Sequence, residues 1–396
     1  MVTRLESRFR HLIWLLQLKI RVVSLNFPGK LIARLYFLVW GKRRFCAADQ
    51  KIYRNTFIDK LATQAKKTHT PPCLKPNSWR IIFFFHKEIL RNNIWMEHEL
   101  AQAYETSAQL FGHSTLFIDP VKDVGTHQST TELRRIFLEF NPTHLILLGD
   151  TRMKEHAGLT DYLLAEFRVK GIKIVAILMD LLFSHKVMGK DLVNFWIDKA
   201  DVLIVHNSRI LNHFPNRTNF LLWPSLPFPK VEPILNETFV QKDHLLILGS
   251  QHRQRELFSK YAVKNGITVA SELNSRRQNF HHFPTWKQYM NRIQESKLVF
   301  TNGYRNFRES QVIARTTEVM LAKSVLLYES GSDIDFFFKP YYDYVPVNSL
   351  PDLVEKARFL LSNEDEWRFI QQNASCTIKN KYSYMIFWDS LAKKLE

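Results

Sequence analysis

From Arg80 to the end of the chain, short and uninterrupted apolar runs alternate with longer amphipathic segments. RIIFFF, which begins at Arg80, and HLLILGS, which begins at His244, are built of Ile, Leu and Phe, and polar residues follow each run. Strands that are apolar along their whole length are typical of parallel sheets with helices on both faces. The alternation therefore predicts an α/β protein.

The alternation falls into two series, and each series predicts a Rossmann-like domain. In the first, a polar loop at 86–93 follows the first strand. The expected strands are 80–85, 114–120, 143–150, 172–180, 201–208 and 219–225, and the expected helices are 94–111, 132–140, 159–169 and 192–198. In the second, the expected strands are 244–250, 267–273, 297–303, 324–328 and 344–347, and the expected helices are 254–266, 285–296, one after Glu318, 350–361, 364–373 and 383–395.

A proline-rich segment, PSLPFPKVEP at 224–233, separates the two series and has the composition of an interdomain linker. Two such domains in tandem leave a crevice between the carboxyl ends of their sheets, where open α/β folds bind ligands. The predicted division is a basic helical leader and linker at 1–79, an N-terminal acceptor domain at 80–230, a linker at 231–242, a C-terminal nucleotide-binding domain at 243–375 and a C-terminal helix at 376–396.

The leader holds most of the positive charge. Residues 1–79 contain 16 Lys and Arg against 3 Asp and Glu, so they supply +13 of the net charge of +17. The apolar runs within 1–45 are far shorter than the ~20 residues that a membrane-spanning helix needs. Basic amphipathic helices rich in Trp, Phe and Leu bind the headgroup region of anionic membranes, and we expect 1–45 to do so. The alternative is that these helices pack on the folded core or on a partner protein, with the basic face in water.

Several absences argue against common function classes. The part of the chain after residue 79 carries little of the net charge, which argues against a nucleic-acid-binding protein. Cys46, Cys73 and Cys376 have no metal-ligand spacing, so we expect free thiols in a reducing compartment. The motifs G-x-G-x-x-G, G-x-x-x-x-G-K-[ST] and G-x-S-x-G are absent, which argues against dinucleotide oxidoreductases, P-loop enzymes and α/β-hydrolases. With only 12 glycines, a phosphate site must depend on side chains and helix starts.

Asp333 and Asp335 form a D-x-D triplet, a spacing that can bind a divalent cation. The triplet follows Gly331-Ser332 and precedes FFFKP, which is more typical of a capped loop that enters a helix. We therefore expect no metal site at this triplet.

The first candidate for a phosphate site follows the strand at 244–250. Gly249 and Ser250 end that strand, and Arg253 and Arg255 stand at or near the start of the next helix. Backbone N–H groups at a helix start, together with guanidinium groups, form a suitable cradle for a diphosphate. The alternative for both arginines is a solvated surface position.

The second candidate is the segment Thr301–Glu318. A strand delivers Asn302 to the same sheet edge, and a polar loop with Ser310 leads to Arg315 and Glu318. A carboxylate near several cations can accept both hydroxyls of a ribose while the cations hold the phosphates. The alternative is that Glu318 caps its helix and pairs with Arg315 at i, i+3.

These residues also carry a resemblance to a known family. Ser310, the sequence RTTE at 315–318, the apolar helix after it and the strand SVLLYES resemble the carboxyl half of GT-B glycosyltransferases, as does the segment from FFFKPYYDYVPV to WRFIQQNA. The resemblance is closest to the CgeB-like group within the group 1 glycosyltransferases, and it covers 243–375.

The resemblance implies a metal-independent enzyme that moves a sugar from a nucleotide-sugar donor to an acceptor held by the N-terminal domain. Glu318 matches the ribose-binding glutamate, Arg315 the arginine three residues before it, and Gly249-Ser250 the loop near the phosphates. An inverting enzyme also needs a general base on the acceptor side. Asp180 is the first candidate, and His86 and Asp150, also at strand ends, come next; the alternative role of each is a loop cap or a hydrogen-bonding residue at the edge of the core.

Three positions depart from the family pattern. Thr317 stands in place of a phenylalanine, Lys323 in place of a glycine and Ser310 in place of a glutamate. They favour an alternative in which the chain is an inactive GT-B scaffold of a glycan-assembly complex; a nucleotide-sugar epimerase is a further alternative. Lys323 either keeps its helix away from its neighbours or adds a charge to the donor site.

The leading prediction is a glycosyltransferase that acts on a glycan or lipid-linked acceptor of the cell envelope. We expect it in the cytoplasm, peripheral on the inner face of the cytoplasmic membrane.

Overall fold

The computed structural model describes residues 78–85, 88–91, 94–97, 102–118, 130–149, 159–179, 181, 189–224, 226–228, 240–250, 253–274, 283, 285–306, 309–310 and 312–396. The membrane-binding prediction for 1–45 lies outside these residues. Within the described ranges, no helix is long and apolar enough to cross a membrane.

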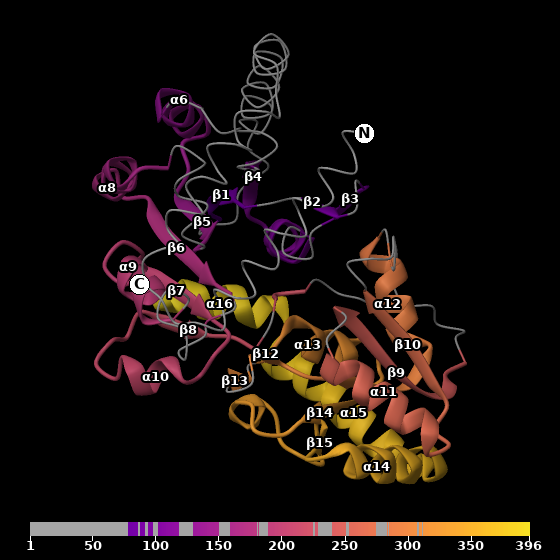
Figure 1. Cartoon of the computed structure of the whole chain (residues 1–396). Coiled ribbons are helices and arrows are strands. Elements are labelled where there is room, and N and C mark those ends of the chain that lie inside the picture. The colour runs from indigo at the N-terminus through magenta and orange to yellow at the C-terminus, as the bar shows by residue number, and fades with distance from the viewer. Residues whose placement is uncertain are drawn as a thin grey trace, which may run out of the picture. The chain divides into compact units, whose positions relative to one another are not determined.

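The first sheet has six parallel strands in the order β4-β1-β5-β6-β7-β8 (Figure 1). Its strands are β1 (Arg80–Phe84), β4 (Ser114–Ile118), β5 (His144–Leu148), β6 (Lys173–Leu178), β7 (Val202–Val205) and β8 (Phe220–Leu222). The helices of this part are the π-helical turn η1 (Gln102–Thr106), α5 (Ser107–Phe111), α6 (Thr130–Phe140), α8 (Asp161–Val169), α9 (Lys190–Trp196) and α10 (Ile210–His213).

The second sheet has five parallel strands in the order β10-β9-β11-β14-β15. Its strands are β9 (Lys242–Ser250), β10 (Val269–Asn274), β11 (Ser296–Thr301), β14 (Val325–Glu329) and β15 (Val345–Val347). Its helices are α11 (Arg253–Lys264), α12 (Trp286–Gln294), α13 (Ala314–Leu321), η2 (Ile334–Phe336), α14 (Leu350–Ser362), α15 (Glu364–Lys381) and α16 (Tyr384–Leu395). The prediction of two Rossmann-like α/β units is confirmed.

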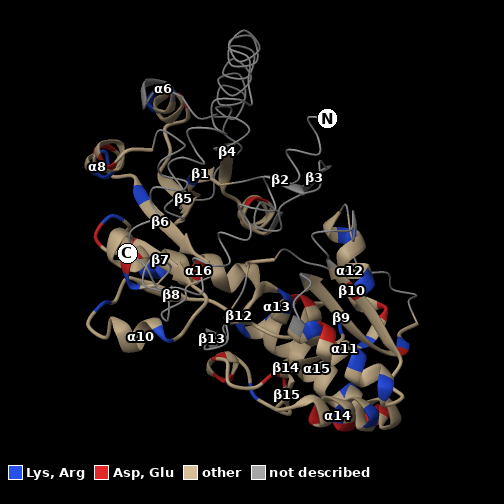
Figure 2. Ribbon diagram, viewed as in Figure 1, with Lys and Arg blue, Asp and Glu red and all other residues tan. Residues whose placement is uncertain are grey.

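The second sheet is covered on both faces because alternate residues of each strand point to opposite sides. Leu245 and Ile247 of β9 pack with residues of α11, α14 and the start of α15, whereas Leu246 and Leu248 pack with α12, α13 and the end of α15. Most of the length of the strands is therefore free of charge, and Lys, Arg, Asp and Glu gather on helices such as α11 and α14 (Figure 2). This layering fixes which strand ends and helix starts meet at one edge.

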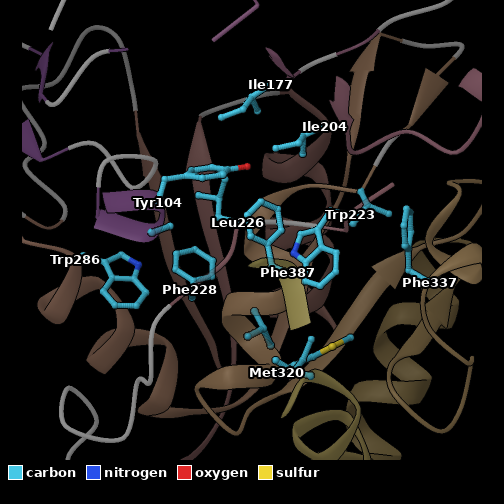
Figure 3. Packing of buried hydrophobic residues seen from close by; sticks show 14 of the residues in the cluster. Tyr104, Ile177, Ile204, Trp223, Leu226, Phe228, Trp286, Met320, Phe337 and Phe387 are labelled. Atoms are coloured by element: carbon cyan, nitrogen blue, oxygen red, sulfur yellow. The ribbon is translucent and has the colours of Figure 1, made fainter. Parts of the chain in front are cut away.

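The last helix, α16, packs on elements of the first sheet. The Trp388 indole Nε1 donates a hydrogen bond to Ser107 Oγ at 3.1 Å. Figure 3 shows Phe387 between Tyr104 and Trp223, with ring centroids 5.6 and 5.2 Å apart, respectively. Buried aromatic pairs of this kind stabilise a core beyond the area that they bury, so the final residues of the chain belong to the core of the N-terminal part.

Some local predictions were wrong. The expected loop at 86–93 and the start of the expected helix at 94–111 instead form an antiparallel pair, β2 (Glu88–Arg91) with β3 (Ile94–Glu97). Residues of the polar loop expected before Arg315 form the short strands β12 (Tyr304–Asn306) and β13 (Glu309–Ser310), and α10 lies in a stretch for which no element was expected. The helix expected after Glu318 is α13, which begins four residues before it, and the helix expected to end at Asn373 continues to Lys381.

Candidate functional site

The carboxyl ends of β9, β11 and β14 bring polar residues together at one edge of the second sheet. β9 and β11 are neighbours, whereas β10, which lies between them in sequence, is on the other side of β9. The chain therefore changes direction between β9 and β11, and open α/β sheets bind ligands at such a switch point. Gly249 and Ser250 end β9, Asn302 follows β11, and Glu329 ends β14.

Two arginines converge on the backbone of Gly249. A Cβ atom at this position would lie 2.8 Å from Arg255 Nη1 and 2.8 Å from Arg315 Nη1. Gly249 has a φ of +118°, a conformation that side-chain-bearing residues rarely adopt. Only glycine therefore allows both the local backbone and the close approach of two positive charges. The sequence predicted Arg255 at this phosphate site and placed Arg315 in the second candidate segment.

Arg255 is anchored in the interior although it is charged. Its side chain is 6% exposed, its Nε donates to Asn302 Oδ1 at 2.8 Å, and its Nη2 donates to the Asn302 carbonyl oxygen at 3.2 Å. A buried guanidinium is costly unless its donors are satisfied. The first turn of α11 and the end of β11 thus hold this arginine in one orientation.

A tyrosine connects Arg315 and Glu318. Arg315 Nε donates to the Tyr289 hydroxyl at 3.1 Å, and this hydroxyl donates to Glu318 Oε2 at 2.8 Å. Arg315 Nη1 also lies 3.5 Å from Thr301 Oγ1, and Glu318 is 1% exposed. Arg315 and Glu318 both lie on α13, whose N-cap residue is Ile313, so Glu318 does not cap the helix. Hydrogen bonds to charged groups are stronger than those between neutral groups, so Tyr289 fixes both side chains.

Glu329 ends β14, the neighbour of β11 on the side away from β9 and Gly249. Gln254 Nε2 donates to its Oε1 at 2.7 Å. Burial raises the pKa of the Glu329 carboxyl to about 7, and the Asn302 amide and the Arg255 guanidinium oppose that rise in part. A carboxyl group with this pKa exchanges its proton near neutral pH.

The remaining predicted residues are placed only in part. Ser250 ends β9, Ser310 ends β13 and Arg253 begins α11, and nothing further is described for their side chains. The catalytic candidates Asp180 and His86, together with Asp150, lie outside the described residues. The structure thus brings together Gly249, Arg255, Asn302, Arg315 and Glu318 among the predicted set.

Lys323 lies at the end of α13 that is remote from this site. Its φ is +59°, its backbone N–H donates to the Met320 carbonyl, and β14 begins two residues later, at the amino end of the sheet. The idea that Lys323 adds a charge to the donor site is therefore wrong. A glycine is favoured at this position because the turn that ends the helix needs a left-handed residue.

The D-x-D triplet is engaged in hydrogen bonds. Asp333 accepts the backbone N–H of Ser208 at 2.6 Å and that of Val312 at 3.2 Å, and Asp335 accepts the hydroxyl of Tyr344. Burial raises the pKa of Asp333 above its ordinary value. Asp333 thus joins the turn after β7 to the segment that leads into α13.

Sequence reasoning missed Tyr289, Gln254 and Glu329. Tyr289 lies on the inner side of an amphipathic helix, and no short motif marks it. Gln254 lies between Arg253 and Arg255, and the phosphate-site prediction used only these two arginines. Glu329 does carry a signal, because it is a carboxylate at the end of an apolar strand that leads to the same edge as Asn302.

The second α/β unit, which contains this site, matches a known protein family. A family model described as glycosyl transferase-like matches residues 240–392, which include β9, α11, α12, β11, α13 and β14. Residues 240–392 are therefore similar to a glycosyl transferase-like domain. The narrower resemblance to the CgeB-like group stays a prediction. A comparison with curated protein sequences found no significant match.

Solved structures share the fold of the whole α/β part. A glycosyltransferase from Rickettsia africae has a TM-score of 0.55 at 11% identity and covers 80% of this chain and 98% of its own. HepE of Anabaena in complex with UDP-glucose has a TM-score of 0.54 at 8% identity, and sucrose-phosphate synthase from Thermosynechococcus elongatus has 0.53 at 8%. Each of these two covers 80% of this chain and 99% of its own. At such low identity the likeness concerns the fold alone, which is the GT-B architecture of two Rossmann-like domains.

Proposed function

We propose that this protein transfers a sugar from a nucleotide-sugar donor to a glycan or lipid-linked acceptor. The observation that carries the proposal is the convergence of Arg255 and Arg315 on Gly249. Two guanidiniums fixed beside one backbone position concentrate positive charge there, and such a site attracts an anionic ligand. A diphosphate at the carboxyl ends of β9 and β11 is an anion of this kind.

Different residues of the site bind different groups of the donor. The two guanidiniums and the first turn of α11 hold the diphosphate, and Glu318, held by Tyr289, accepts the hydroxyls of the ribose. During transfer the bond between the anomeric carbon and the diphosphate oxygen breaks, and the electron pair goes to the diphosphate. Fixed positive charges at this point stabilise the leaving group as its negative charge grows. This chemistry requires no metal ion.

The acceptor belongs to the N-terminal part in this proposal. The acceptor hydroxyl attacks the anomeric carbon, and a general base takes its proton. Asp180 is the first candidate for this base and His86 the second, because each follows a strand of the first sheet in sequence. The basic segment 1–45 places the enzyme on the inner face of the cytoplasmic membrane, where a lipid-linked acceptor is available. HepE, a structural neighbour, binds UDP and UDP-glucose, which supports a uridine nucleotide as the first donor to test.

A thermal-shift panel tests the proposal. UDP, GDP, TDP and their sugar conjugates are added to the wild type, Arg315→Ala and Glu318→Gln, and each shift is measured against the same variant without ligand. Arg368→Ala and Glu364→Ala, which remove an exposed ion pair on α15, are the matched controls. We expect a stabilising shift in the wild type and the controls and its loss in the two site variants. No shift with any nucleotide, or equal shifts in all variants, would contradict the proposal.

A further inference from the structure

The Glu329 carboxyl combines burial with incomplete hydrogen bonding. Its Oε1 accepts a hydrogen bond from Gln254, but its Oε2 is buried and has no hydrogen-bond partner among the residues that the structure describes. A buried charged oxygen that lacks a partner is very costly, and a neutral, protonated carboxyl at the same place costs much less. The arrangement therefore favours a carboxyl group that carries a proton for part of the time.

The neighbours of Glu329 show which charged group shifts the pKa of its carboxyl. Among the residues that the structure describes, the charged group that acts on it is the Arg255 guanidinium of α11. Gln254 and Asn302, from α11 and the end of β11, are neutral, and the partner of Glu329 on β15 is Val347. Glu329 lies on the same face of β14 as Val325 and Leu327. This face packs against α11 and α14, which contribute apolar core residues such as Phe258 and Leu353.

Arg255 is shared between Glu329 and the proposed diphosphate position. Its Nη1 lies 2.8 Å from the point where a Cβ of Gly249 would be, and its charge lowers the pKa of Glu329. A bound diphosphate both repels a carboxylate at Glu329 and takes over the favourable interaction with Arg255. Each effect disfavours the charged form of the carboxyl group.

We propose that Glu329 is a proton-linked residue of the donor site, which takes up a proton when a nucleoside diphosphate binds beside Arg255 and releases it when the diphosphate leaves. This inference rests on the proposed function, because it needs the diphosphate at Gly249. Linkage is reciprocal, so the proton also controls the nucleotide. Nucleotide affinity then falls as the pH rises above 7, by up to about tenfold per pH unit for one proton.

Calorimetric titration of UDP in buffers of different ionisation enthalpy measures the protons taken up on binding. The wild type is compared with Glu329→Gln and with Glu295→Gln, a matched control whose carboxyl interacts with Lys242 and Arg292 at the amino end of the sheet. Protons that UDP itself gains or loses are common to all three proteins. We expect Glu329→Gln to take up fewer protons, by up to one per bound UDP, and to lose less affinity between pH 7 and 8.

A second measurement does not depend on the folding of a variant. The infrared difference spectrum of the wild type, with and without UDP at pH 7.5, is expected to gain the band of a protonated carboxyl. UDP binding with equal proton uptake in the wild type and Glu329→Gln, or without that band, overturns this inference alone. A wild type that binds none of UDP, GDP or TDP overturns the proposed function together with it.

Discussion

The Arg315 guanidinium lies against the backbone of Gly249, where an added Cβ atom would be 2.8 Å from Nη1 and 3.0 Å from Nη2. The contact joins the first turn of α13 to the end of β9. At the end of β11, the strand between β9 and β14, Thr301 Oγ1 lies 3.5 Å from Arg315 Nη1. The absence of a side chain at Gly249 is thus a condition of the site.

Substitution of Gly249 by alanine is expected to damage both the fold and the site. The new Cβ clashes with Arg255 and Arg315, and the backbone at φ +118° is strained. We expect a loss of about 1–3 kcal/mol in the free energy of unfolding and at least tenfold weaker nucleotide binding. Urea denaturation and calorimetry measure the two effects.

Gly266 provides the matched control for this substitution. It also has a positive φ, +79°, but an added Cβ would have no atom within 4 Å. Gly266→Ala is expected to lose stability through the backbone alone and to keep its nucleotide affinity. Equal nucleotide binding by Gly249→Ala and the wild type would show that the two arginines do not form the site.

Tyr289→Phe removes the hydroxyl that joins Arg315 to Glu318. Both side chains lose an anchor, and hydrogen bonds to charged groups contribute about 1.5–3 kcal/mol each. We expect nucleotide affinity to fall by about tenfold or more in calorimetric titrations. Tyr382→Phe, which removes a hydroxyl bonded to the Phe337 carbonyl, should keep the wild-type affinity. An unaltered affinity in Tyr289→Phe would exclude a positioning role.

Lys323→Gly is expected to stabilise the protein. At φ +59° the left-handed backbone costs free energy for a lysine but not for a glycine. The Lys323 side chain is exposed. The expected gain is about 1 kcal/mol in urea denaturation, with no change in nucleotide binding because the residue is remote from the site. A destabilised variant, or one with altered nucleotide affinity, would contradict this placement.

Two buried histidines should make the protein sensitive to acid. Burial lowers the pKa of His113 to about 4 and that of His144 to about 3, and both rings stack on Trp79. Below the unfolded-state pKa of about 6.5 the unfolded chain binds protons that the native rings do not, so stability falls as the pH falls from about 6.5 toward 4. His144→Gln should reduce the slope by about 1.4 kcal/mol per pH unit, whereas His213→Gln, at an exposed position, should leave it unchanged.

The strands and most helices were predictable because their signal is local. A run such as RIIFFF is apolar throughout because it lies between two helical layers, and that burial is visible in the sequence itself. The pair β2 and β3 was missed because EILR and IWME are too short to show a period. EILR lies in the expected polar loop at 86–93, and IWME lies at the start of the expected helix at 94–111. The helix expected at 364–373 continues to Lys381, and Ala374 and Ile378 extend its buried side.

The site was predictable to the extent that strand ends and helix starts define it. Gly249, Arg255, Asn302, Arg315 and Glu318 each stand next to such an end, so the order of the elements was enough to group them. Tyr289 reaches the site from the middle of α12, and its role follows from how that helix packs beside α13. Such a contact between residues far apart in sequence has no local signature.

The most direct test of the account compares the dissociation constants of UDP and uridine for the wild type and Arg315→Gln by calorimetry. If Arg255 and Arg315 hold the diphosphate, the wild type should bind UDP at least about 100-fold more tightly than uridine, since each charge-assisted contact contributes about 1.5–3 kcal/mol. Arg315→Gln should reduce that ratio by about tenfold or more. An equal ratio in the two proteins would contradict the assignment of the diphosphate to the arginines at Gly249.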